Sequence, residues 1–90
     1  MTPLEKRLAA WHRRKFGPGG VLVEVTLVKA MEEMGELARA ILAGDTDNAR
    51  EEAADIAIVL VHLVRGLGGS LFDEMEKKAV VIDRRLVHGR

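Results

Sequence analysis

Apolar residues recur at helical spacing along most of this chain, and the pattern predicts four helices. The first should run from about Pro3 to Lys15, because Thr2 is a good N-cap, proline suits the first helical position and Glu5 completes a capping box. The glycine-rich segment 17–20 ends this helix, and it lacks the lysine and Ser/Thr of a phosphate-binding loop.

The second predicted helix spans roughly Val21 to Leu42. Its first eight residues are rich in β-branched side chains and read locally as a strand, but no breaker separates them from a segment with clear helical spacing. The third helix is predicted from about Asp47 to Arg65, and the fourth from Ser70 to about Val87. The expected fold class is therefore all-α, with four helices in one protomer.

Size and composition predict one domain, residues 1–90, that associates with itself. A domain this short buries only about 60–65% of the surface of its unfolded chain, so its core alone would be marginal. Yet 48% of the residues are hydrophobic, and almost all of these are aliphatic. We therefore expect the helical bundle to be completed by homo-oligomerisation.

Charge and cysteine content exclude several classes of function. Fourteen basic and fourteen acidic residues cancel, which argues against stable nucleic-acid binding. The chain has no cysteine, so disulfides and zinc–thiolate sites are excluded and a cytoplasmic location is expected. The longest apolar stretch, 56–64, is too short to cross a membrane, and the polar start is not a signal peptide, so no membrane partner is expected.

Three carboxylates, Glu32, Glu33 and Glu36, share one arc of the second predicted helix. A solvent-facing acidic stripe is the plain alternative. In the third predicted helix, Asp55 precedes a segment that is apolar on all sides and is therefore expected to be buried. An unpaired carboxylate at the mouth of such a segment would be costly, and the same helix offers no Lys or Arg between Glu51 and Val64.

The short connection between the second and third helices predicts antiparallel neighbours, which can bring Glu36 near Glu52 and Asp55. Geometry leaves Glu51 and Glu52 both open as the partner of Asp55. Several carboxylates without cysteine suit a hard cation, Mg²⁺ first and Mn²⁺ second.

The pattern EExxE, followed after fifteen residues by ExxD, closely resembles the signature of the MazG-like nucleoside triphosphate pyrophosphohydrolases, from the all-α NTP pyrophosphatase superfamily. The resemblance extends from Trp11 to about Arg85. It implies Mg²⁺-dependent hydrolysis of an NTP or dNTP to the monophosphate and pyrophosphate, by a homodimer or a dimer of dimers. The metal and catalytic carboxylates that it implies are Glu32, Glu33, Glu36, Glu52 and Asp55.

The family pattern thus selects Glu52 rather than Glu51. One carboxylate that the metal does not fully engage would take the proton of the attacking water, and Glu33 and Glu36 are the candidates.

Members of the family often carry a lysine and, four residues later, an asparagine in the last helix. Here Lys78 is present but residue 82 is isoleucine.

Four residues are candidates for substrate binding. Lys29, Lys78 and Arg85 are candidate phosphate contacts, and Trp11 could stack on a base, although a core position is the commoner role for a lone tryptophan. His62 is interpreted as a satisfied core histidine rather than a residue that supports the metal site. Gly35 is expected to let two helices approach closely.

Three other functions stay open. One is a degenerate member of the resembled family that binds nucleotide without turnover, which the isoleucine at residue 82 and the short chain suggest. Phosphoribosyl-ATP pyrophosphohydrolases resemble this chain in size and acidic motifs. A non-catalytic helical association module would leave the glutamates in solvent and would show no metal dependence.

Overall fold

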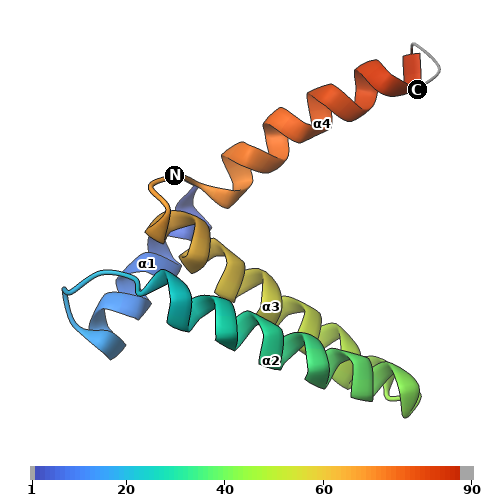
Figure 1. Ribbon diagram of the computed structural model, residues 1–90, viewed down its shortest axis with the longest axis horizontal. Coiled ribbons are helices and arrows are strands. Elements are labelled where there is room, and N and C mark those ends of the chain that lie inside the picture. The colour runs from blue at the N-terminus through green and yellow to red at the C-terminus, as the bar shows by residue number, and fades with distance from the viewer. Residues whose placement is uncertain (1, 88–90) are drawn as a thin grey trace.

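The computed structural model describes residues 2–87, and within that range it is entirely helical apart from turns and loops (Figure 1). The helices, in chain order, are α1 (Pro3–Phe16), α2 (Val23–Leu42), α3 (Thr46–Gly66) and α4 (Leu71–Val87). The all-α fold class is confirmed. The four helices lie within a few residues of the predicted ranges.

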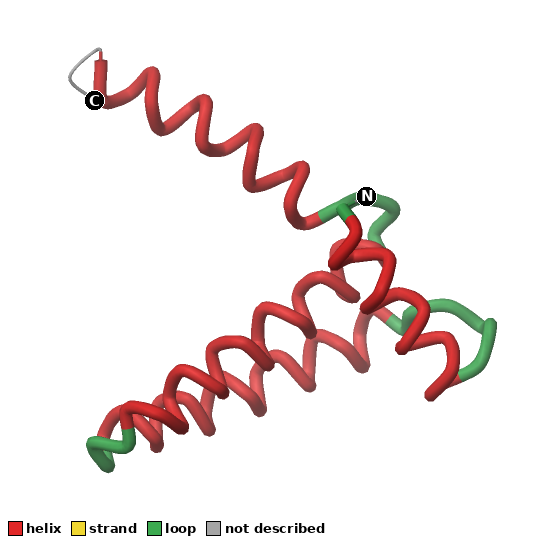
Figure 2. The backbone as a smooth tube through the Cα atoms, turned by 180° about the vertical axis from the view of Figure 1, so that it is seen from behind, coloured by secondary structure: helices red, strands yellow, loops and turns green. Residues whose placement is uncertain are grey.

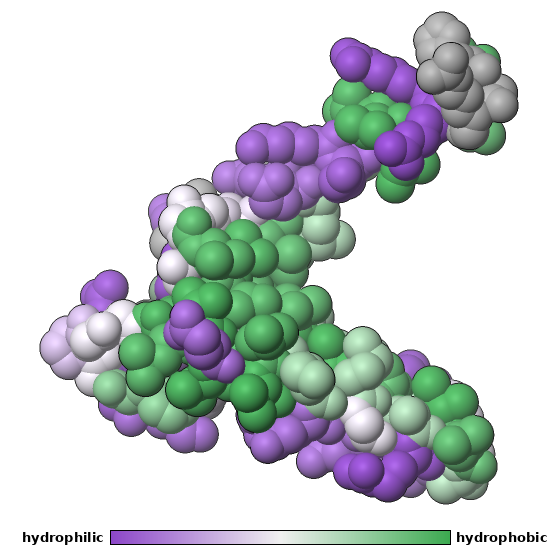
Figure 3. Space-filling model, viewed as in Figure 1, coloured by the Kyte–Doolittle hydropathy of each residue, from purple (hydrophilic) through white to green (hydrophobic). Residues whose placement is uncertain are grey.

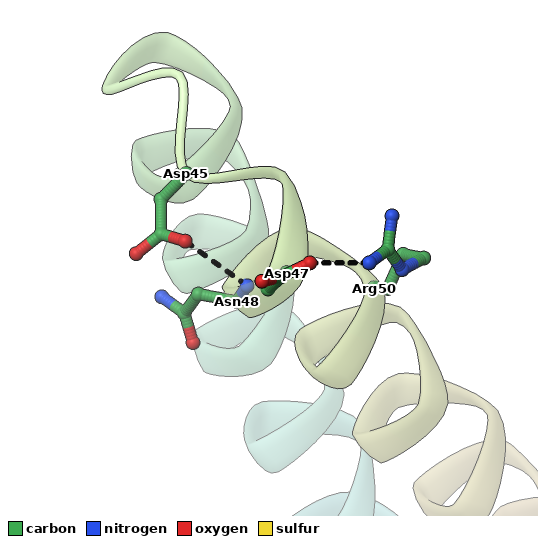
Figure 4. Close-up of polar contacts among 4 residues, drawn as sticks. All are labelled: Asp45, Asp47, Asn48 and Arg50. Carbon is green, nitrogen blue, oxygen red and sulfur yellow. Dashed lines mark hydrogen bonds and ion pairs between the residues drawn. The ribbon is translucent and has the colours of Figure 1, made fainter.

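Helices α2 and α3 form an antiparallel hairpin, and they lie side by side along their whole length in both backbone views (Figures 1 and 2). The turn passes through Gly44, whose φ of +74° is a left-handed conformation that favours glycine. Asp45 then caps α3, because its Oδ1 accepts a hydrogen bond of 3.2 Å from the Asn48 N–H (Figure 4). Asp47 and Arg50 form an ion pair in the first turn of α3 (Figure 4).

Helix α1 packs across the open end of the hairpin, against α3 (Figure 1). Its predicted capping box is present: Thr2 Oγ1 accepts from the Glu5 N–H at 3.1 Å, and Glu5 Oε1 accepts from the Thr2 N–H at 3.0 Å. Glu5 is only 2% exposed, and its other oxygen accepts a 2.6 Å hydrogen bond from the Ser70 hydroxyl. Ser70 Oγ in turn accepts from the Asp73 N–H, so one buried contact ties the start of α1 to the start of α4.

Helix α4 leaves the rest of the molecule at 97° to α3 and extends as a separate arm (Figure 1). Every residue from 73 to 87 is exposed. Within residues 2–87, no single helix is long and apolar enough to cross a membrane; α3 and α4 together pass that test only as a bent pair.

Few apolar side chains are buried in this single chain. Ala40, Ile56 and Val61 form the core, while large apolar residues along α2 and α4 remain uncovered (Figure 3). The expectation that α3 is buried on most sides after Asp55 holds only in part for the single chain. Within 56–64, Ile56, Val61 and His62 are buried and Ala57 is exposed, while the others are half-buried. Helix α2 covers one side of α3, and α4 turns away instead of covering another.

Two local predictions also differ from the structure. Val21 and Leu22 lie outside α2, since the chain leaves Gly20 at φ +83° and Leu22 is extended. Gly35 is not at a close helix contact, because a Cβ there would meet only the tip of Arg39, at 3.8 Å. The close approach occurs at Gly66, where a Cβ would lie 3.0 Å from side-chain atoms of both Val21 and Val23.

Candidate active site

Three carboxylates meet across the α2–α3 hairpin. Glu33 and Glu36 are three residues apart on α2 and so share one face of that helix. The antiparallel α3 brings Glu52 opposite them, and one oxygen from each of the three residues lies within 4.8 Å of the others. The hairpin thus produces the convergence that the sequence predicts for Glu36 and Glu52.

Glu33 is the most deeply buried member of this acidic cluster, defined here as Glu33, Glu36 and Glu52. It is 7% exposed, and its Oε1 lies 3.0 Å from Lys29 Nζ, one turn earlier on α2. The hydrogen bond from Lys29 lowers the pKa of Glu33 although burial acts in the opposite direction. Glu33 is therefore held as a carboxylate, in a fixed position.

Glu52 is half-buried, and its Oε2 has no hydrogen-bond partner. Burial, followed by the nearby Glu33 and Glu36 carboxylates, raises the pKa of Glu52 from 4.5 to about 7. Three carboxylates that share one site need a proton or a cation to offset their repulsion. The unpartnered oxygen and the all-oxygen donor set fit a hard divalent cation such as Mg²⁺.

A cavity of about 290 Å³ adjoins the cluster on the side of the hairpin turn. Its polar lining consists of three acidic residues, Glu36, Glu52 and Asp45, together with Arg39 and Asn48. Sequence reasoning missed the last two residues. Arg39 had a usable signal, since it is three residues after Glu36 and falls on the same face of α2, whereas Asn48 has no such relation to the acidic motif in sequence.

The structure does not bring Glu32 and Asp55 into the cluster. Both are exposed, and the prediction that Asp55 is buried at the mouth of an apolar segment is wrong for the single chain. Asp55 lies about 60° around α3 from Glu52, on a flank that α2 does not cover. The geometry also decides between Glu51 and Glu52 as members of the cluster, because Glu51 is exposed and only Glu52 reaches the other carboxylates.

The predicted substrate contacts are scattered. Lys29 is already paired with Glu33, and Lys78 and Arg85 are exposed on the α4 arm, which departs from its own hairpin. Trp11 is 42% exposed and stacks on His62 at 6.1 Å between ring centroids, so the core position expected for it is wrong. His62 is buried as predicted but is not satisfied, because neither ring nitrogen has a hydrogen-bond partner.

Comparison with known proteins gives one match. Residues 23–78 match the family model of the MazG nucleotide pyrophosphohydrolase domain. No curated protein and no solved structure matches the chain significantly. The matched range includes all three carboxylates of the acidic cluster, and it leaves out α1 and the end of α4.

Proposed function

We propose, from the premise that the chain belongs to the MazG nucleotide pyrophosphohydrolase family, that it hydrolyses a nucleoside or deoxynucleoside triphosphate to the monophosphate and pyrophosphate with the help of Mg²⁺. Membership makes the protein a hydrolase that acts on the acid anhydride bonds of nucleotides. The observation that supports the finer proposal is the convergence of Glu33, Glu36 and Glu52 within 4.8 Å across the hairpin.

The acidic cluster would hold the cation. When bound there, Mg²⁺ would offset phosphate charge and lower the pKa of a coordinated water, and Mn²⁺ could replace it. Lys29 keeps Glu33 ionised and oriented. Of the two candidate bases, Glu36 is favoured to accept the proton of the attacking water, because Glu33 is already engaged by Lys29.

Glu32 and Asp55 are retained in this proposal as further carboxylates at the rim of the site. Both are exposed and have room to turn toward a substrate-bound cation. The adjoining cavity would take the phosphate chain, and Arg39 supplies positive charge on its wall.

Self-association would supply the remaining substrate contacts. The α4 arm carries Lys78 and Arg85 away from the hairpin of its own chain, so we propose that they act at the site of another copy in a homodimer or a dimer of dimers. Large apolar residues on α4 support this assembly, since they are at least one-third exposed in the single chain: Met75, Val80, Val81, Ile82 and Leu86.

A pyrophosphate-release panel over all NTPs and dNTPs tests the proposal, with Mg²⁺ or Mn²⁺ and with metal removed. Glu36→Gln and Glu52→Gln should each reduce turnover by about 10²-fold or more. Glu51→Gln is the matched control, because Glu51 is the exposed neighbour of Glu52, and it should keep nearly full activity.

Several outcomes would contradict the proposal. Equal activity in Glu51→Gln and Glu52→Gln would remove the site assignment. Turnover of phosphoribosyl-ATP without any NTP or dNTP would assign the other pyrophosphohydrolase activity. A melting temperature that does not respond to Mg²⁺ would argue against a metal site, since a ligand of the folded state must stabilise it.

A further inference from the structure

A second cavity, of about 350 Å³, lies at the opposite end of the hairpin from its turn. The end of α1, the glycine-rich loop 17–20, the residues before α2 and the end of α3 enclose it. Its charged or titratable lining residues are His12, Arg13 and Arg65, and no acidic residue lines it. We call it the basic cavity.

The basic cavity contains hydrogen-bond donors that the described residues do not satisfy. Arg65 Nη1 is buried and has no partner. Directly behind the wall, His62 is 5% exposed, both of its ring nitrogens lack partners, and its ring centroid lies 4.6 Å from that of His12. Buried polar groups in folded proteins are nearly always hydrogen-bonded. Neutral His62 has one donor and one acceptor nitrogen, whereas the Arg65 guanidinium can only donate, so what Arg65 lacks at the cavity wall is an acceptor.

The electrostatics specify the sign of that component. Burial and the neighbouring Arg13 lower the pKa of Arg65, and burial and Arg65 lower the pKa of His12. These groups therefore repel one another's positive charge, and no carboxylate on the cavity wall offsets it. An anion would relieve the repulsion and accept a hydrogen bond from the Arg65 guanidinium.

The start of α2 adds favourable polarity. Val21 lines the cavity two residues before α2 begins, and the N-cap Leu22 provides no side-chain hydrogen bond to the first N–H groups of the helix. Uncapped N–H groups at a helix start attract anions. This feature agrees with the arginines and histidines but does not define the site by itself.

The basic cavity is separate from the acidic cluster. Arg65 follows Glu52 by thirteen residues on α3, which corresponds to about 20 Å along the helix axis. The two sites have opposite charge, and they share no lining residue.

We infer that the basic cavity is a binding site for a phosphate-class oxyanion, held by Arg13 and Arg65 with His12 on the wall. The shared ligand chemistry is a tetrahedral phosphate, either free or as the terminal group of pyrophosphate or a nucleotide. Arginine suits this ligand because its planar guanidinium can donate two parallel hydrogen bonds to phosphate oxygens. The site goes beyond the proposed hydrolysis, since it does not contact the acidic cluster.

The test is binding in metal-free buffer, so that the acidic cluster does not recruit phosphate through a cation. Inorganic phosphate, pyrophosphate and a nucleoside monophosphate are titrated separately into the full-length protein. Melting temperature and calorimetry measure binding, and the ring resonances of His12 report its location. At least one of the three anions should bind saturably, raise the melting temperature and shift the His12 resonances, and their relative affinities identify the source.

Three variants make the test specific. Arg13→Gln and Arg65→Gln should each weaken the binding by about tenfold or more. Arg14→Gln is the matched control, because Arg14 is an exposed neighbour that does not line the cavity. Arg13 is also exposed, so its substitution remains informative if Arg65→Gln fails to fold.

The result is independent of the hydrolysis assay. Glu36→Gln should lose turnover yet bind the anion as the unsubstituted protein does. The inference is overturned if none of the three anions binds, or if Arg13→Gln binds them as tightly as Arg14→Gln does. Absence of binding together with loss of self-association in Arg65→Gln would show that an acidic side chain of a second copy fills the cavity instead.

Discussion

Gly66, the last residue of α3, packs tightly against Val21 and against Val23 at the start of α2. A Cβ added there would be 3.0 Å from Val21 Cγ1 and 3.0 Å from Val23 Cγ2. Carbon atoms in favourable contact are about 3.5–4.0 Å apart, so the two segments would have to separate by about half an ångström. Both valines have stiff side chains that cannot easily rotate away.

The expected loss of stability follows from two opposing effects. Overpacking of this kind costs about 1–3 kcal/mol. Replacing glycine by alanine gains up to about 1 kcal/mol inside a helix and less at its last residue. We therefore expect Gly66→Ala to lower the free energy of unfolding by about 1 kcal/mol.

Gly35 provides the matched control, since it lies within α2 and a Cβ there would meet only Arg39 Nη1, at 3.8 Å. Gly35→Ala should raise the free energy of unfolding by up to about 1 kcal/mol. Urea unfolding at a fixed protein concentration measures both variants, and the midpoints should move in opposite directions without a change in slope. A Gly66→Ala protein as stable as the original would refute the close packing, and a destabilised Gly35→Ala protein would place Gly35 at a helix contact.

The pKa shifts give two further predictions, for metal-free and metal-bound protein. Burial, then Arg65 and His12, lower the pKa of His62 from 6.5 to about 4. The unfolded chain therefore binds a proton at His62 more readily than the folded one, and the free energy of unfolding falls as pH drops from 6.5 toward 4. The pKa of Glu52 is raised from 4.5 to about 7. The folded state therefore binds a proton at Glu52 more readily than the unfolded chain, and the free energy of unfolding rises as pH drops from 7 to 4.5. In metal-free buffer, Glu52→Gln should therefore make the melting temperature fall more steeply below pH 6.5, and an unchanged slope would contradict the raised pKa of Glu52. Mg²⁺ binding near pH 6 should release about one proton, measured by calorimetry in buffers of different ionisation enthalpy. Glu52→Gln should abolish the release and Glu51→Gln should keep it; equal release by both variants would exclude Glu52 as its source.

The sequence predicted the helices well because the signals that begin and end them are local. Thr2 and Glu5 form the predicted capping box, with Pro3 as the first helical residue, and Gly44 follows the end of α2 near the predicted position. The error at Val21 and Leu22 has a local cause as well. These residues extend the apolar pattern, but only the structure shows that the chain is still extended after Gly20.

The acidic cluster was predictable only in part. Helical spacing alone places Glu33 and Glu36 on one face of α2. Spacing leaves Glu51 and Glu52 both open; the family resemblance selects Glu52, and the rotation of α3 against α2 gives the physical reason. The same rotation exposes Asp55, whose expected burial assumed that α3 is covered on most sides. Helix α4 does not supply that cover, since it leaves α3 at 97°, and the residue before it, Ser70, is bound to Glu5, 65 residues away in sequence.

Charge separation along the hairpin explains why the basic cavity was missed. Acidic and basic residues cancel in the whole chain, so the total charge gives no sign of an anion site. Folding brings the end of α1 against the end of α3, so that Arg13 and Arg65, far apart in sequence, line the same cavity. The carboxylates gather on the same hairpin about 20 Å away. Each group of like charges is destabilising on its own, and the two ligands proposed above, a divalent cation at the carboxylates and an oxyanion at the arginines, would each offset one of them.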